Sequence, residues 1–244
     1  MPGDPAYDCA MATVVAGTPS QALIGARRTF TAAAGIGIAV GVYGVSFGVL
    51  AVAAGLSPAQ ACVMSMLTFT GASQFAFVGV LAGGGGALTA IAPAVILAVR
   101  NAAYGLSLSP ILPRRLRDRA LLAHLVIDES TAMARAEDDP VAARRAFLAT
   151  GISVWFCWNA GTLAGAVLGG GLGDPRALGL DAMFPAAFLA LLAPQLRRPG
   201  APVAAIAGAL IAVVVLPFAP PGVPIIAALA GVVPGVLVAR GIRS

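Results

Sequence analysis

A cluster of polar side chains interrupts the apolar stretch LTFTGASQFAFVGV. Thr70, Ser73 and Gln74 lie there around Gly71. A glutamine amide inside a lipid-embedded helix costs free energy unless it finds hydrogen-bond partners. Glycine is a poor helix former, and Gly/Ser pairs are a recognised cause of helix kinks. The pattern therefore predicts a break in a helix near Gly71.

A helix that begins directly after Gly71 presents free backbone N–H groups at residues 72–75, at the positive end of its dipole. Such a terminus binds anions. We expect Thr70 to cap this helix and Ser73 to donate its hydroxyl, with Gln74 beside them, so that the site suits a carboxylate. The alternative is that these small polar residues only pack helices together.

A second polar group lies within another apolar stretch, VRNAAYGLSLSP. Arg100 is always charged and needs water, a partner or a ligand inside a membrane. Asn101, Tyr104 and Ser107 follow at intervals of three residues, roughly on one face of a helix. We predict a polar stripe that faces a pore and binds a carboxylate. The alternative is a structural ion pair between Arg100 and an acid such as Asp128 or Asp181.

An acidic pair, Asp128 and Glu129, follows the apolar residues of HLVIDESTA. These carboxylates either cap a helix or enter a cavity from the cytoplasmic side, where one would take a substrate ammonium or a proton. A zwitterion needs one positive and one negative locus. We therefore predict its carboxylate at the break and Arg100, and its ammonium at Asp128 or Glu129.

The composition places these groups in a membrane protein. Hydrophobic residues make up 59% of the 244-residue chain, charged residues only 10%, and the mean hydropathy is +0.93. Soluble domains carry about 25% charged residues. A spanning helix needs about 20 apolar residues, and runs of this length predict an all-α helical bundle with six or seven crossings. The seven apolar segments are 30–54, 59–82, 87–109, 146–169, 179–196, 201–218 and 221–239.

The remaining sequence organises the chain around these segments. Residues 1–28 are expected to form a flexible tail, and 29–240 a single transmembrane domain. The polar stretch 113–145 is expected to be a cytoplasmic loop, because it holds most of the arginines. The basic pI near 9.9 is thus a topology signal and does not indicate nucleic-acid binding.

The arginines also orient the bundle. If the last four segments all cross, eleven arginines lie on one side with the C-terminus and only Arg176 lies on the other. The positive-inside rule makes the first side cytoplasmic. Seven full crossings place Arg27, Arg28 and the N-terminus outside. A re-entrant second segment, broken at Gly71, places them inside and makes the count thirteen to one.

The sequence lacks the groups that membrane enzymes need. The single histidine, His124, excludes an HExxH metalloprotease site. Residues 71–73 resemble a serine protease setting, yet a glutamine follows where a glycine is required. Cys9, Cys62 and Cys157 are too far apart for a metal cluster, and no Walker A loop occurs. We therefore predict no enzyme activity, metal or cofactor.

Four blocks of the sequence together resemble the AzlC family, also called YgaZ or BrnF, in the same order along residues 47–239. They are FGVLAVAAGLSPAQACVMSMLTFTGASQFAFVGVLAGGG, RNAAYGLSLSP, HLVIDESTAMA and FPAAFLALLAP. The FTGASQF block is the most specific. One departure is Ala98, where the family pattern leads us to expect asparagine.

The resemblance implies the large subunit of a branched-chain amino acid exporter in the bacterial cytoplasmic membrane. It also implies a small membrane partner of the AzlD type and coupling to an ion gradient. We therefore predict a multi-pass secondary transporter that exports apolar amino acids. The alternative is a membrane channel or a scaffold subunit that does not transport.

Overall fold

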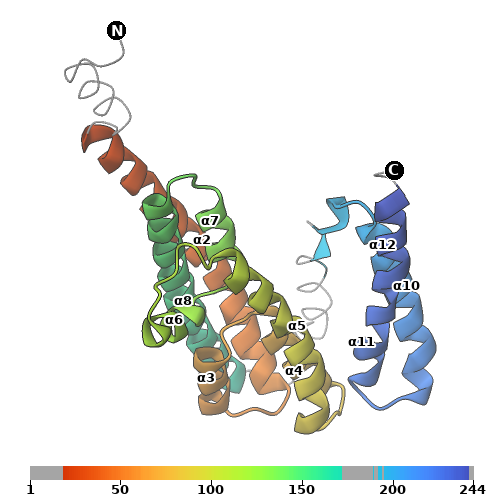
Figure 1. Ribbon diagram of the computed structural model, residues 1–244. Helices are drawn as coiled ribbons and strands as arrows, with labels where there is room; N and C mark the ends of the chain where they lie inside the picture. The colour runs from red at the N-terminus through yellow and green to blue at the C-terminus, as the bar shows by residue number, and fades with distance from the viewer. Residues whose placement is uncertain (1–18, 172–188, 190–191, 194, 242–244) are drawn as a thin grey trace, which may run out of the picture. The chain divides into compact units, whose positions relative to one another are not determined.

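The described part of the chain is built from helices (Figure 1). The computed structural model describes residues 19–171, 189, 192–193 and 195–241. Within these residues there is no β-strand, as the sequence predicts. The helices are α2 (Pro19–Ala53), α3 (Pro58–Leu67), α4 (Ala72–Ala82), α5 (Ala87–Ser107), α6 (Leu116–Ala123), α7 (Asp128–Arg135), α8 (Pro140–Gly171), η3 (Gln195–Arg197), α10 (Ala201–Val215), η4 (Leu216–Phe218), α11 (Val223–Ala227), η5 (Ala228–Gly231) and α12 (Val232–Gly241).

Five helical stretches of the described chain are long and apolar enough to cross a membrane. This differs from the seven predicted segments for two reasons. The second segment is divided into α3 and α4, each too short to span a bilayer on its own. The fifth, 179–196, lies mostly outside the described residues. The five are Leu23–Ala53, Ala87–Ser107, Pro140–Gly171, Ala201–Phe218 and Val223–Gly241.

The boundaries predicted for the N-terminal tail and the polar loop differ from those of the observed helices. α2 begins at Pro19, so the last ten residues of the expected tail 1–28 are helical, and residues 1–18 lie outside the described part. The expected loop 113–145 contains α6, α7 and the start of α8. It is therefore a pair of short helices with connections and not one continuous loop.

The chain forms two compact units. The first combines residues 1–39 with 104–156, and the second combines 40–103 with 157–244. Because α2, α5 and α8 pass from one unit to the other, each unit contains a part of all three helices.

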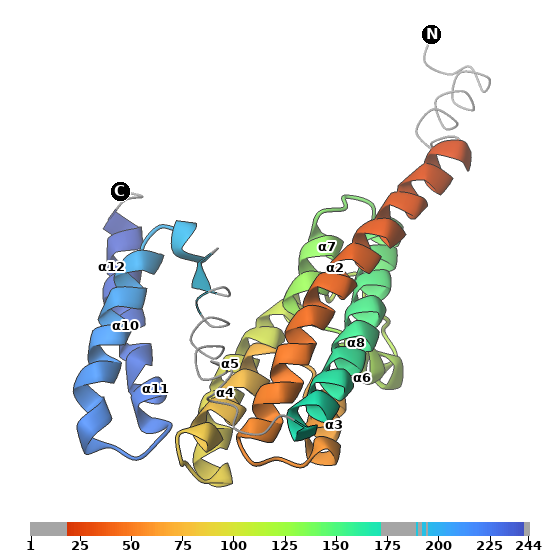
Figure 2. The ribbon, with the colours of Figure 1, turned by 180° about the vertical axis from the view of Figure 1, so that it is seen from behind.

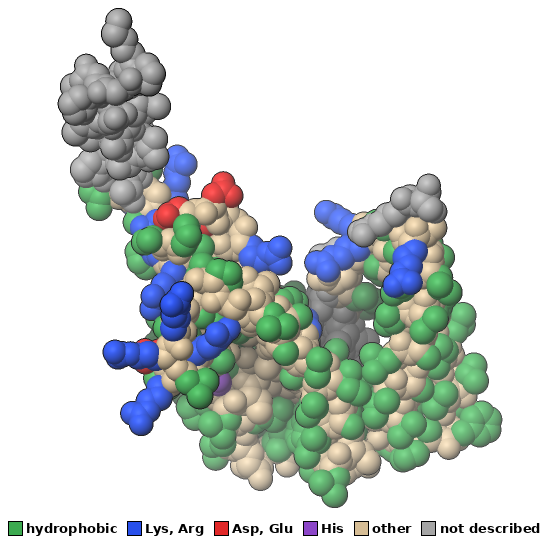
Figure 3. Space-filling view, in the orientation of Figure 1, with side chains coloured by type: hydrophobic (Ala, Val, Ile, Leu, Met, Phe, Trp, Pro, Cys, Tyr) green, Lys and Arg blue, Asp and Glu red, His purple; other side chains and the backbone are tan. Residues whose placement is uncertain are grey.

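The first unit has its own hydrophobic core. Leu108 after α5, Val126 before α7 and Phe147 of α8 are buried together, with Ala134 and Leu112 completing the cluster. The arginines of this unit lie outside the core: Figure 3 shows basic side chains gathered over α6. The polar stretch is thus folded by apolar contacts and keeps its charges at the surface.

In the second unit, α2 and α8 pack through small residues. A Cβ atom on Gly44 would lie 2.6 Å from the Trp158 carbonyl oxygen, and one on Gly161 would lie 3.0 Å from the Val45 nitrogen. The backbones therefore approach more closely than larger side chains permit, a packing mode common between membrane helices. Further along the chain, α10 packs against η5 and α12 in a hairpin.

Candidate functional site

The short helix α3 has defined signals at both ends. Ser57 and Gln60 form a capping box: the Gln60 N–H donates to Ser57 Oγ at 3.2 Å, and the Ser57 N–H donates to Gln60 Oε1 at 2.8 Å. At the other end, Thr68 folds back on the Met64 carbonyl, to which its N–H and its hydroxyl donate at 2.9 and 2.7 Å. The N–H bond is the last i→i−4 bond of the helix, which ends because Thr68 itself leaves the helical conformation, with φ −111° and ψ 34°.

Gly71 makes the turn into α4. Its φ of +61° and ψ of −86° are accessible to glycine and strained for other residues. The Phe75 N–H then donates to the Gly71 carbonyl at 3.1 Å, the first intrahelical bond of α4. The prediction that free N–H groups extend to residue 75 is therefore wrong by one residue. The N–H groups of 72–74 precede this bond and are the ones that an α-helix leaves without internal acceptors.

Gln74 joins the two helix ends. Its side chain is 1% exposed. Its Oε1 accepts from the Gly71 N–H at 3.1 Å, and its Nε2 donates to the Met64 carbonyl at 3.5 Å. Both ends of the amide thus bond to backbone, one on each side of the break. This explains how a glutamine is tolerated in apolar surroundings: its polar atoms are hydrogen-bonded within the protein.

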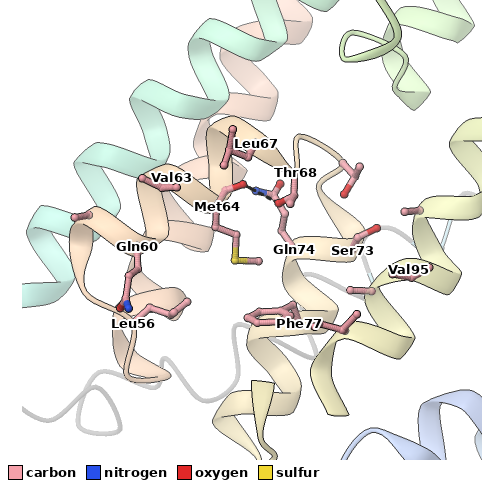
Figure 4. Close-up of a pocket in the computed structure, with 15 residues that line it drawn as sticks. Leu56, Gln60, Val63, Met64, Leu67, Thr68, Ser73, Gln74, Phe77 and Val95 are labelled. Atoms are coloured by element: carbon pink, nitrogen blue, oxygen red, sulfur yellow. Dashed lines mark hydrogen bonds between the residues drawn. The ribbon is translucent and has the colours of Figure 1, made fainter. Parts of the chain in front are cut away.

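The two helices run in opposite directions on either side of the break. Figure 4 shows α3 rising from Gln60 to Leu67 and α4 descending from Gln74 to Phe77. The ribbon seen from front and back agrees (Figures 1 and 2). The bond from Gln74 to Met64, ten residues earlier, holds the pair together at its tip. The break is therefore the tip of a helical hairpin.

A cavity of about 780 Å³ lies along this hairpin and α5 (Figure 4). Its wall is mainly apolar, and the polar groups gather at the break. None of the described residues in the wall carries a charge. The lining residues are Leu56, Ala59, Gln60, Val63, Met64, Leu67, Thr68, Thr70, Ser73, Gln74, Phe77, Ile91, Ala94, Val95 and Ala98.

Two hydroxyls in this wall have no hydrogen-bond partner within the described structure. They are Thr70 Oγ1, directly before the turn, and Ser73 Oγ, in the first turn of α4. Ser73 is 6% exposed, and in Figure 4 its hydroxyl points from α4 toward the side of α5 that carries Val95. Buried hydroxyls without partners are costly. Their presence beside a cavity marks a place where a ligand would supply the missing bonds.

Aromatic side chains of α2 and α8 pack against Phe75 of α4. Phe75 meets Phe47 edge to face with ring centroids 5.7 Å apart, and Trp158 with centroids 6.1 Å apart. Phe47 and Trp158 stack at 5.8 Å. Phe75 is therefore a packing residue. Phe77, two residues further along α4, lines the cavity instead.

The structure brings only part of the predicted second group near the cavity. Arg100 and Asn101 are half-buried on α5, but the α5 wall of the cavity ends at Ala98. The Asn101 Oδ1 is buried with no hydrogen-bond partner in the described chain. Ala98, which departs from the expected family pattern, faces the cavity and leaves its wall apolar at that point.

The other predicted residues belong to the first unit. Tyr104 packs against its hydrophobic core. Asp128 and Glu129 are half-buried in the first turn of α7, where negative charge is favourable to the helix dipole. The α7 terminus itself is closed by Ser130, whose hydroxyl accepts from the Ile127 N–H at 3.2 Å and lies 2.6 Å from the Leu125 carbonyl that it donates to.

One polar contact of the second unit was not predicted. The hydroxyls of Ser65 and Thr162, both fully buried, lie 3.1 Å apart and join α3 to α8. Single hydroxyls 97 positions apart give no sequence signal of their pairing. For metal binding, the described residues contain no group of three or more His, Cys, Asp or Glu side chains that would hold an ion.

Comparisons with known proteins agree with the sequence motifs. The family model for the AzlC protein matches residues 35–172, a range that contains the break and the cavity wall. The inner membrane protein YgaZ of Escherichia coli (strain K12) is 33% identical over 204 residues, covering 80% of this chain and 81% of that protein. No solved structure is significantly similar. The predicted resemblance is thereby confirmed.

Proposed function

The chain belongs to the AzlC family, and on that premise we propose that it is a secondary transporter of apolar amino acids. Its substrates would include the branched-chain amino acids, which it exports across the bacterial cytoplasmic membrane. It would act as the large subunit beside a small AzlD-type membrane protein. Its relative YgaZ is an inner membrane protein, which supports this location.

The single observation that carries this proposal is the cavity at the tip of the α3–α4 hairpin. Broken helices whose ends face a cavity are typical binding sites of secondary transporters. Here unpartnered hydroxyls of Thr70 and Ser73 meet a mainly apolar wall that includes Met64 and Phe77. A polar head group would bind at the break and an apolar side chain along the wall.

The hairpin also bears on the proposed topology. α3 has 10 residues and α4 has 11, so each is about 15 Å long, half of the roughly 30 Å hydrocarbon core. Because they run in opposite directions, the pair enters and leaves on one side of the membrane. This favours the re-entrant version of the second segment, with both termini and 113–145 cytoplasmic and thirteen arginines against one.

The proposed contacts fall into two groups. Thr70, Gly71, Ser73 and Gln74 form the break itself. Arg100 and Asn101 follow the cavity wall on α5. If α5 shifts during transport, Arg100 would supply a positive charge and Asn101 a hydrogen bond to the carboxylate. The substrate contacts predicted for Tyr104, Asp128 and Glu129 stay predictions, because these residues lie in the first unit.

Counterflow in proteoliposomes tests the proposal. The full chain is reconstituted with its small partner, vesicles are loaded with unlabelled leucine, and uptake of labelled leucine is followed. A carrier shows transient, saturable accumulation of label, which Gln74→Ala and Arg100→Gln reduce strongly at equal protein levels. Label entry that does not saturate indicates a channel, and no exchange indicates a scaffold. Unchanged flux in both variants would remove the site from the proposal.

A further inference from the structure

We infer that the break binds both ends of an α-amino acid at its two helix ends: the carboxylate at the start of α4 and the ammonium at the end of α3. This inference rests on the proposed function and deepens it. It differs from the sequence-based prediction that Asp128 or Glu129 holds the ammonium. The ammonium subsite would instead consist of backbone carbonyls at the C-terminal end of α3.

The carboxylate end rests on two independent features of α4. The N–H groups of residues 72–74 precede the first intrahelical bond, at the positive end of the helix dipole. Beside them Ser73 has a hydroxyl with no hydrogen-bond partner in the described structure, although the residue is more than nine-tenths buried. Its hydroxyl points into the space between α4 and α5 (Figure 4). A carboxylate would satisfy both features at once.

The ammonium end rests on the C-terminal turn of α3. The Met64 carbonyl already accepts from Thr68 and Gln74. The carbonyls of residues 65–67 follow it, where an α-helix has no N–H of its own to offer and carries the negative end of its dipole. Leu67 and Thr68 line the cavity, so this turn borders it directly. Half-helix C-termini bind cations in other transporter sites.

The charge of the cavity wall points the same way. A zwitterion that leaves water must have both charges compensated, yet the described wall has no acidic or basic side chain. The two helix ends supply the required partial charges of opposite sign. The 3.5 Å bond from Gln74 Nε2 to the Met64 carbonyl ties the first turn of α4 to the last turn of α3, so both helix ends belong to the same break.

Gln74 then has a different role from the predicted ligand. Its amide bridges the Gly71 N–H and the Met64 carbonyl, one group from each side of the break. It is a positioning residue that fixes the distance between the carboxylate and ammonium subsites. The groups that touch the substrate are the Ser73 hydroxyl, the N–H groups of 72–74 and the carbonyls of 65–67.

Equilibrium binding to the full chain in lipid nanodiscs tests the inference, with empty nanodiscs as the background. Three probes separate the subsites: leucine, 4-methylpentanoate (leucine without its ammonium) and 3-methylbutylamine (leucine without its carboxylate). Both analogues should bind about tenfold or more weakly than leucine. Such a factor corresponds to ~1.4 kcal/mol or more for each head-group charge.

The decisive variant introduces a charge at the end of α3. Leu67 is 72% exposed and lines the cavity, so Leu67→Lys places an ammonium where the substrate ammonium is expected. It should weaken leucine binding and leave or strengthen binding of 4-methylpentanoate, reversing the preference. Leu67→Met is the matched neutral control and should keep the wild-type order. Ser73→Ala should weaken leucine and 4-methylpentanoate by a similar factor but not 3-methylbutylamine.

The acidic pair supplies the outcome that would overturn the inference. With the break holding both charges, Asp128→Asn combined with Glu129→Gln keeps the preference for leucine over 4-methylpentanoate within about twofold. Loss of that preference in this variant, or an unchanged preference in Leu67→Lys, places the ammonium elsewhere while the proposed transport function stands. If the wild-type chain binds leucine no better than empty nanodiscs do, the proposed function falls together with the inference.

Discussion

The N-termini of α4 and α7 are capped by the same kind of side-chain hydrogen bond but differ in whether they can bind an external anion. In each helix the third residue reaches back to the N–H of the residue before the helix: Gln74 to Gly71 at 3.1 Å, and Ser130 to Ile127 at 3.2 Å. Both capping side chains are buried. Each terminus therefore satisfies one of its own N–H groups without water.

The neighbours of the capping residue separate the two sites. α7 carries Asp128 and Glu129 in its first turn, so its own carboxylates already stand at the positive end of the dipole. α4 carries Ala72 and Ser73 at these positions and has no acidic residue there. An external anion would be repelled at α7 and attracted at α4. The residues beside the capping side chain therefore decide whether a helix N-terminus is free to bind an anionic ligand.

The largest loss of transport is expected from a substitution at Gly71, the residue before α4, whose backbone conformation differs from that of Ile127 before α7. Gly71→Ala places a Cβ on a residue with φ +61°, a strain of ~1–3 kcal/mol, although the space beside it is open. The turn would relax and separate the two helix ends, so leucine counterflow should fall to background. The measurement is counterflow together with the thermal unfolding midpoint in nanodiscs.

One control isolates the backbone effect in Gly71→Ala. Gly86→Ala adds the same methyl group in open space with no positive φ. It should retain both counterflow and the wild-type midpoint. Wild-type flux and midpoint in Gly71→Ala would show that the shape of the break is not required.

Loss of the bridging amide should have the next largest effect. Gln74→Met keeps the side-chain volume but removes both bonds, leaving buried backbone groups unpaired at ~1–3 kcal/mol. The midpoint should fall, and leucine should bind more weakly because the helix ends are no longer held at a fixed distance. Gln60→Met is the matched control: Gln60 caps α3 in the same way but is exposed, so water replaces its bond. A similar fall in midpoint for both variants would contradict the role given to burial.

The two serines should respond in opposite ways. Ser130→Ala removes a hydroxyl that is hydrogen-bonded to Leu125 and Ile127, and should lower the midpoint, by ~1–3 kcal/mol of unfolding free energy, without changing leucine affinity. Ser73→Ala removes a buried hydroxyl that has no partner, so the midpoint should hold or rise. Its leucine affinity should fall about fivefold, the loss of ~1 kcal/mol. Equal effects of the two variants on stability and binding would erase the distinction between α4 and α7.

The sequence was sufficient to predict the class of fold, a helical protein with several long apolar helices. Long apolar runs fix membrane helices, because about 20 residues must cover the hydrocarbon core. Gly71 beside Ser73 and Gln74 predicts a local break, because these residues act within one turn of helix. The direction of α4 relative to α3 had to be left open, since it depends on the tertiary bond from Gln74 to Met64.

The partners of the site residues were harder to predict. Phe75 is a large apolar residue beside the break and could contact a ligand, yet it packs on Phe47 and Trp158, which lie far away in the sequence. Asp128 and Glu129 have the charge that a substrate ammonium needs, but they also stand in the first turn of α7, where they complement the helix dipole. Residue type shows what a side chain can bind, whereas only the packing of distant segments shows what lies within its reach.

The smallest effect is expected at the acidic pair of α7. Asp128→Asn removes one favourable charge at a helix N-terminus, worth ~0.3–1 kcal/mol of unfolding free energy, so the midpoint should fall slightly. Leucine affinity should change less than about twofold, because the substrate charges are compensated at the break. Glu129→Ala serves as the parallel variant in the same turn, and the affinity is measured in nanodiscs at low and high salt, which screens exposed charges but not buried ones. A loss of leucine binding in Asp128→Asn at unchanged midpoint would place a substrate contact at α7. The α4 terminus would then bind the carboxylate and the α7 terminus the ammonium.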